Sequence, residues 1–170
     1  MNTKRVTVLP YDENWPREFL KIKAELEAAL GETALRIEHV GSTSVAGLCA
    51  KPVIDLDVVI RDASAFLQAA SKLAKIGYEH EGDLGIPGRE AFGYRGKEHL
   101  QKHHLYVCAQ DSKELRRHLA FRDYLRAHPE AAREYGRIKE EGAALYPCGI
   151  DHYIAHKAPF IEEIYRRLGL

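Results

Sequence analysis

The stretch IEHVGSTSVAGLCAKPVIDLDVVI, residues 37–60, constrains the fold more than any other part of the sequence. Its second half is a β-branched run that begins at Pro52, and such a run is too apolar to lie exposed on a surface. Asp55 and Asp57 nevertheless lie within this run. Because residues two apart in a strand share a face, both carboxylates point the same way and Leu56 points the other way. The sequence therefore predicts a buried strand with one polar face.

The Asp-x-Asp pair on that face predicts a cation site. Two adjacent carboxylates repel each other, and without partners in a dry environment they would cost several kcal/mol or take up a proton. A hard divalent ion, Mg²⁺ or Mn²⁺, suits carboxylate oxygens best. The alternative is an exposed strand face on which lysine or arginine pairs with the aspartates, and the flanking apolar residues disfavour it. We therefore expect Asp55 and Asp57 to be metal ligands.

The first half of the stretch predicts a strand followed by a turn that can hold phosphate. Apolar and polar residues alternate over residues 35–40, and Gly41 ends the pattern. A helical turn beginning at Ser42 or Ser44 would leave its first N–H groups unpaired at the positive end of the helix dipole, where anions bind. Ser and Thr after Gly are also ordinary cap and turn residues. This motif alone is compatible with both interpretations.

Composition predicts one globular domain over residues 1–170. The 170 residues are 45% hydrophobic and 29% charged, which is ordinary for such a domain. The 25 Lys and Arg balance the 25 Asp and Glu, so nucleic acid is an unexpected partner.

Cys49, Cys108 and Cys148 form no CxxC motif and fit reduced thiols. No apolar run is long enough to span a membrane, and the start MNTKR lacks a signal-peptide core, so a cytoplasmic location without a membrane partner is expected.

Periodicity and punctuation predict an α/β (α+β) fold, with a small mixed β-sheet, flanking helices and a helical C-terminal half. Apolar spacing predicts a helix over residues 14–30. The remaining elements are a strand at 5–9, a helix from Asp62 to Gly77, a strand at 78–81, and a glycine-marked loop and hairpin up to Cys108. Beyond it, Asp111 and Glu114 are expected to form a capping box, and Asp151 to cap the last helix.

The motif HVGSTSVAGLCAKPVIDLDVV resembles the core motif of the GrpB-like family. The resemblance continues through GIPGRE, KHHLYVC, FRDYLRAHP and HYIAHKAPFIEEI, and so covers nearly the whole chain. That family is placed in the nucleotidyltransferase (polymerase β-like) superfamily, which is marked by a Gly-Ser turn followed by an Asp-x-Asp strand. The sequence departs from the family pattern at Ala46, at Glu90 and Ala91, and at Tyr106, where proline, arginine with an aromatic residue, and histidine are usual.

The resemblance implies the nucleotidyltransferase topology and a metal-dependent transfer of a nucleoside monophosphate from a nucleoside triphosphate to a small acceptor. Asp55, Asp57 and His104 would be the catalytic residues. The superfamily takes a third carboxylate from a neighbouring strand, but KHHLYVC contains none, and His104 is expected in its place. The residues expected to bind the substrate are His39, Gly41, Ser42, Thr43, Ser44, Lys51, Arg89 and Lys157.

Two other functions remain open from the sequence, because fold and superfamily do not determine the reaction. Without a third carboxylate, the chain could be a nucleotide- or phosphometabolite-binding module that does not turn over. Alternatively, His104 and His39 could join the two aspartates in metal-dependent hydrolysis. The transferase is the favoured interpretation.

Overall fold

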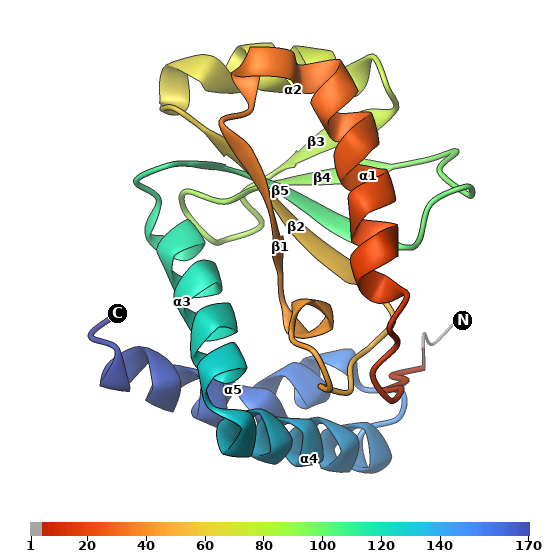
Figure 1. The fold of residues 1–170 in the computed structure, drawn as a ribbon, viewed down its shortest axis with the longest axis vertical. Helices are drawn as coiled ribbons and strands as arrows, with labels where there is room; N and C mark the ends of the chain where they lie inside the picture. Colours follow the sequence, from red (N-terminus) through yellow and green to blue (C-terminus); the bar gives the residue numbers. More distant parts are fainter. Residues whose placement is uncertain (1–4) are drawn as a thin grey trace.

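The computed structural model describes residues 5–170, which form a five-stranded mixed sheet with helices on both faces (Figure 1). The strands are β1 (Arg36–Val40), β2 (Ile54–Ile60), β3 (Tyr78–Gly82), β4 (Glu90–Tyr94) and β5 (His103–Ala109). The helices are α1 (Trp15–Leu30), α2 (Phe66–Ala74), α3 (Lys113–Ala127), α4 (Pro129–Leu145) and α5 (Ile150–Arg167). The predicted mixed sheet and helical C-terminal half are confirmed.

The strand order in the sheet is β1-β2-β5-β4-β3. Only β2 and β5 run parallel, and the other three neighbouring pairs are antiparallel. The strand with the Asp-x-Asp motif therefore lies inside the sheet, with β1 on one side and β5 on the other. This position explains its β-branched composition, because an interior strand covered on both faces has little contact with water.

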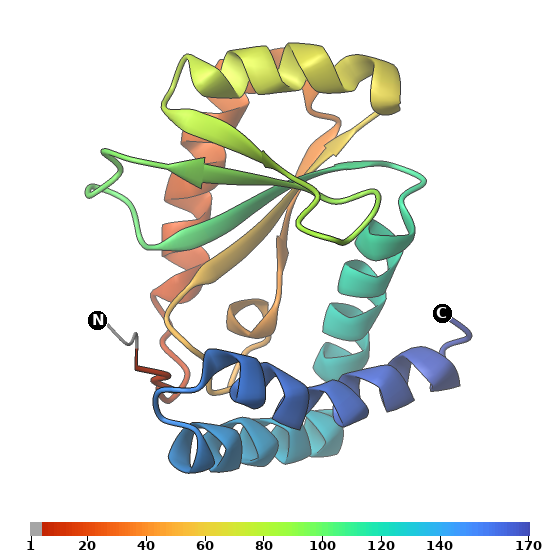
Figure 2. The ribbon, with the colours of Figure 1, turned by 180° about the vertical axis from the view of Figure 1, so that it is seen from behind.

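The main hydrophobic core lies between the sheet and the first two helices. Ile54, Leu56 and Val58 of β2 are fully buried there, against Ile22 and Leu26 of α1. Figure 1 shows α1 running along this face of the sheet, and Figure 2 shows α4 and α5 lying together beyond the end where β2 and β5 begin. α3 packs on the other face of the sheet, where Leu115 contacts Val59 and Cys108.

Three local predictions are wrong. The predicted strand at 5–9 is reduced to one bridge between Leu9 and Ala50, because no neighbouring strand continues the pairing. Ser112 caps α3 in place of Asp111, and its Oγ accepts a hydrogen bond from the backbone N–H of Leu115. α5 begins at Ile150, before the expected cap. No helix among residues 5–170 is long and apolar enough to cross a bilayer.

Candidate functional site

The turn after β1 lies directly against the first aspartate of β2. β1 and β2 pair so that Val40 lies opposite Asp55, and residues Ser42–Ser44 form a single 3₁₀ turn immediately beyond. Gly41 has a positive φ of 71°, and a Cβ placed on it would overlap the carboxylate of Asp55. Only glycine permits this close approach, because any other residue would be strained and would displace the carboxylate.

The two aspartates share a face of β2 but have different surroundings. Asp55 is partly exposed, with 29% of its side chain accessible, and its Oδ1 accepts a hydrogen bond from Nδ1 of His104 at 2.9 Å. Asp57 is fully buried, and its Oδ2 pairs with Nδ1 of His118 on α3 at 2.6 Å. Burial raises the pKa of Asp57, and the bond to His118 opposes that shift. Burial lowers the pKa of His118, but Asp57 outweighs it, so the net shift is upward.

The two carboxylates fit a divalent cation if the ligand supplies further oxygens. Within residues 5–170, the Oδ1 atom of Asp57 is buried without a hydrogen-bond partner, and a cation would satisfy it. No group of three or more His, Cys, Asp or Glu in that part of the chain could hold a metal ion. Mg²⁺ is commonly bound by one or two carboxylates together with substrate phosphates and water. Asp55 and Asp57 provide this kind of donor set.

A pocket of about 220 Å³ opens beside Asp55, and we call it the lysine pocket. It is lined by Ser42, Thr43, Ala50, Lys51, Val53, Asp55, His104, Lys139, Tyr153, Ile154 and Lys157. Burial lowers the pKa of Lys139 to about 7 and that of Lys157 to about 8, and it also lowers the pKa of Lys51. Buried ammonium groups that lie close to one another have lowered pKa values unless an anion neutralises them. The lysine pocket is therefore suited to a multiply charged anion.

Six of the residues predicted from the sequence meet in the lysine pocket: Ser42, Thr43, Lys51, Asp55, His104 and Lys157. Lys139 was not predicted, although it shares a helical face with buried Tyr135, four residues earlier, and a lysine on an apolar face is a detectable signal. Lys139 is 1% exposed and donates a hydrogen bond to the carbonyl oxygen of Cys49. His118 was also missed, and no spacing in the sequence connects it with Asp57.

The expectation that His39 binds the substrate is corrected, because His39 does not line the lysine pocket. It pairs with Leu56, so its side chain lies on the α1 face of the sheet, opposite to Asp55. Its ring stacks on Phe19 with centroids 4.6 Å apart, and its Nε2 lies 2.9 Å from Oγ1 of Thr43. Burial lowers the pKa of His39 to about 4, so the ring is neutral at pH 7. His39 therefore supports the turn from the α1 face of the sheet.

Ser44 and Arg89 also lie outside the lysine pocket. The hydroxyl of Ser44 donates to the carbonyl oxygen of Gly41, so it is used within the turn. The guanidinium of Arg89 lies over the ring of Tyr106, 4.2 Å from its centroid. From there its positive charge opposes the upward shift that burial causes in the pKa of Asp57. Neither side chain is among those that line the lysine pocket.

The GrpB protein family model matches residues 5–167. The chain belongs to the GrpB family. It is 36% identical over 159 residues to the UPF0157 protein YqkA of Bacillus subtilis, covering 94% of this chain but only 46% of that protein. It is 35% identical over 169 residues to the glutamate-rich protein GrpB of Alkalihalophilus pseudofirmus, covering 96% of each. This GrpB-family chain thus spans about half of one curated relative and nearly all of another.

Solved structures show that the GrpB fold is shared with nucleotidyltransferases. The crystal structure of the conserved protein GrpB from Enterococcus faecalis matches with a TM-score of 0.81 at 33% identity, over 96% of this chain and all of that one. Cid1 in complex with the UTP analog UMPNPP matches with a TM-score of 0.52 at 14% identity, over 78% of this chain and 40% of Cid1. The predicted family and the nucleotidyltransferase-like topology are therefore confirmed.

Proposed function

We propose that this chain is a metal-dependent nucleotidyltransferase, which moves a nucleoside monophosphate from a nucleoside triphosphate to a small-molecule acceptor. One observation supports this proposal above the others: three lysines and a Ser-Thr turn surround a pocket whose wall includes Asp55. A polyphosphate is the anion that matches several neighbouring ammonium groups next to a carboxylate able to share a metal ion.

The lysine pocket is suited to the phosphates of the substrate. Its volume of about 220 Å³ is below the ~300–1,000 Å³ that is typical of sites enclosing whole ligands, so the nucleoside would extend outside it. Lys51 and Lys157 would neutralise the terminal phosphates, and Ser42 would donate hydrogen bonds to them. Lys139, buried below them, would contribute its charge from the floor of the pocket.

Asp55 and Asp57 would hold Mg²⁺ or Mn²⁺, whose charge neutralises the phosphates and the leaving pyrophosphate. His104 would act as the general base. Its Nδ1–H donates to Asp55, which leaves Nε2 free to take a proton, and 47% of the side chain is exposed. As the acceptor oxygen bonds to the α-phosphorus, the bond from that phosphorus to the β-phosphate oxygen breaks and pyrophosphate leaves. The acceptor hydroxyl proton passes to Nε2 of His104.

A second function is supported by the burial of Asp57. This carboxylate is inaccessible and already paired with His118, and the neighbouring strand offers His104 and Tyr106 where the superfamily has a third carboxylate. A module of the same fold that binds a nucleotide or phosphometabolite without turnover would have these features. For the hydrolytic alternative, His104 remains beside Asp55, whereas His39 lies on the opposite face of the sheet.

Calorimetric titration with each of the four nucleoside triphosphates, with and without Mg²⁺, tests the proposal. We expect metal-dependent binding that weakens at least tenfold in Lys51→Met and in Lys157→Met. Lys75→Met is the matched control, because Lys75 is exposed and lies outside the lysine pocket. If none of the four binds in a metal-dependent way, the nucleotidyltransferase is rejected. Pyrophosphate release that Asp57→Asn abolishes would reject the module without turnover.

A further inference from the structure

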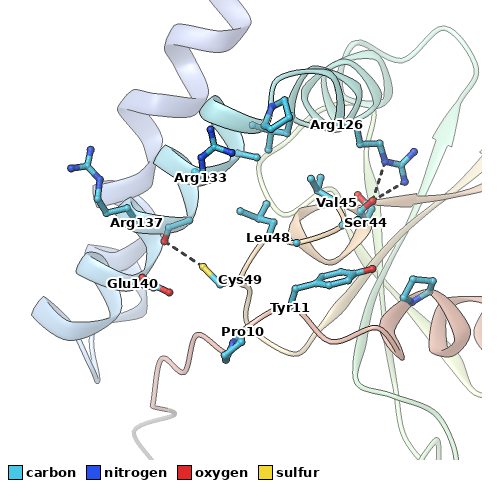
Figure 3. Close-up of a pocket in the computed structure, with 17 residues that line it drawn as sticks. Pro10, Tyr11, Ser44, Val45, Leu48, Cys49, Arg126, Arg133, Arg137 and Glu140 are labelled. Carbon is cyan, nitrogen blue, oxygen red and sulfur yellow. Dashed lines mark hydrogen bonds between the residues drawn. The ribbon is translucent and has the colours of Figure 1, made fainter.

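We propose that a second cavity, behind the turn that borders the lysine pocket, binds a small organic anion with an apolar body. This cavity, which we call the arginine cavity, has a volume of about 970 Å³ and lies between α4, residues 44–49 and residues 10–16 (Figure 3). The proposed site is separate from the nucleotide site and does not depend on the reaction proposed for it.

Apolar side chains form much of the arginine cavity wall. Val45, Leu48 and Leu125, each no more than 3% exposed, belong to the second hydrophobic cluster of the protein and also line the cavity. Tyr11 adds an aromatic ring from the segment that precedes α1 (Figure 3). An apolar group bound against these residues would leave water at little further cost, because the cavity already exists in the fold.

Three arginines give the arginine cavity a positive charge. Arg133 and Arg137 lie one helical turn apart on α4, about 6 Å along its axis, and Arg126 lies at the end of α3. Within residues 5–170, Arg133 and Arg137 make no salt bridge, and Arg126 bonds only to the carbonyl oxygen of Ser44, at 2.7 and 3.0 Å. One carboxylate lines the cavity, that of Glu140, so the net charge favours an anion. Several guanidinium groups lining one cavity suit a carboxylate, phosphate or sulfonate.

The two ligand sites lie on different sides of the same loop and the same helix. Ser42, Thr43 and Lys51 face the lysine pocket, whereas residues 44–49 face the arginine cavity. On α4, Lys139 faces the lysine pocket, while a Cβ on Gly136 would lie 3.3 Å from Sγ of Cys49. The loop and the helix are therefore in close contact between the two sites. A ligand in the arginine cavity would contact residues 44–49 of this loop. The phosphates of the proposed substrate would contact Ser42, Thr43 and Lys51 on its other side.

The dimensions favour a small molecule over a polymer. About 970 Å³ is at the upper end of the ~300–1,000 Å³ range typical of enclosed small-molecule sites. From Pro129 to Glu140, the α4 wall is about 16 Å long, as given by the helical rise per residue. A ligand of that length can place its anionic group at Arg133 and Arg137 while its body lies on Tyr11 and Ala46, which line the cavity and are not buried.

Fluorescence titration with 8-anilinonaphthalene-1-sulfonate, an aromatic anion, tests the proposal on the folded protein. We expect one saturable site, with a Kd that rises at least tenfold in the double variant Arg133→Gln, Arg137→Gln. Arg116→Gln is the matched control for general surface charge, because Arg116 is exposed and lies outside the cavity. A second test variant, Ala46→Phe, adds bulk to an exposed lining residue without changing charge, and it should weaken binding as strongly.

Further measurements locate the probe and define its chemistry. Lys51→Met and Lys157→Met should leave its Kd unchanged, and an uncharged probe, N-phenyl-1-naphthylamine, should bind at least tenfold more weakly than the anion. Three results would overturn the proposal: a Kd insensitive to the arginine pair, equal weakening by Arg116→Gln, or loss of binding in the lysine variants. Displacement of the probe by single-stranded RNA or an acidic peptide at lower concentration than by any small anion would also overturn it.

Discussion

The two faces of β2 are both buried, yet they are stabilised in different ways. On the α1 face, Ile54, Leu56 and Val58 have no exposed surface and pack within the main apolar core. On the opposite face, Asp57 is equally inaccessible, and its Oδ2 has His118 as hydrogen-bond partner. Apolar packing is distributed over many contacts, whereas a buried charge depends on a single neighbour. One strand therefore combines a face stabilised by packing with a face stabilised by individual hydrogen bonds.

The comparison predicts that His118→Ala is the most damaging single change on the polar face. It removes the hydrogen-bond partner of the buried Asp57 carboxylate, and such a loss costs about 3–5 kcal/mol of the free energy of unfolding. Urea unfolding at pH 6.5 measures it. The double variant Asp57→Asn, His118→Gln, which keeps a neutral pair, should recover most of the loss. A loss below about 1 kcal/mol in His118→Ala would show that the pair does not stabilise the fold.

The pH dependence of that loss has a defined sign. The pKa of His118 is raised in the folded state from an ordinary value of 6.5. Its stabilising contribution is therefore complete below pH 6.5 and is lost as the pH rises through the folded-state pKa. The difference in unfolding free energy between wild type and His118→Ala should shrink from pH 6.5 upward.

On the apolar face, Leu56→Ala should cost about 2–5 kcal/mol, because it leaves a cavity in the main core. Its effect should be confined to stability, since Leu56 points away from the lysine pocket. Calorimetry on the folded fraction should give the same Kd for nucleotide as wild type. A Kd that changes more than threefold would mean that the two faces are not independent.

Gly41→Ala should combine a moderate loss of stability with a severe loss of ligand binding. The positive φ alone costs about 1–2 kcal/mol, and the new Cβ displaces the Asp55 carboxylate. Gly47→Ala is the matched control, because Gly47 also has a positive φ, of 82°, but has open space around its Cβ position. Both variants should lose similar stability in thermal melts, while only Gly41→Ala loses metal-dependent nucleotide binding. Equal binding by the two variants would contradict the placement of the site.

The smallest predicted effect is a pH dependence of nucleotide binding. In the empty pocket, the pKa values of Lys139 and Lys157 are about 7 and about 8, so both lysines lose their protons as the pH rises from 7 to 9. A bound polyphosphate requires them charged, so the Kd should rise at least tenfold over this range, or ~1.4 kcal/mol. Calorimetry in two buffers of different ionisation enthalpy should detect proton uptake. Lys139→Met should flatten the dependence, and an unchanged slope would exclude Lys139 from the site.

Local sequence patterns predicted most of the sheet and the first helix. The β-branched run around Asp55 indicated an interior strand, and the apolar spacing from Trp15 to Leu30 marked α1 almost to the residue. The same kind of pattern failed over residues 5–9, because an alternating segment becomes a strand only where a neighbour pairs with it, and only Leu9 does so.

The site was predicted where it depends on residues close in sequence and missed where it depends on packing. Gly41 directly follows β1, and Asp55 lies in β2, the next strand along the chain and the partner of β1, so their meeting follows from local signals. The contact between His118 and Asp57 requires knowing that α3 packs on the polar face of β2. The hydroxyl of Ser44 was assigned to substrate because local patterns do not show that it bonds within its own turn.

The lysine pocket unites the beginning and the end of the chain. Ser42 and Asp55 come from the first third of the sequence, whereas Tyr153 and Lys157 come from the last helix. During translation, all five strands leave the ribosome before α5, because α5 comes last in the element order. A nascent chain at that stage has Asp55 and the Ser-Thr turn but lacks Lys157. A chain that ends before Lys157 would therefore gain little stabilisation from the proposed ligand.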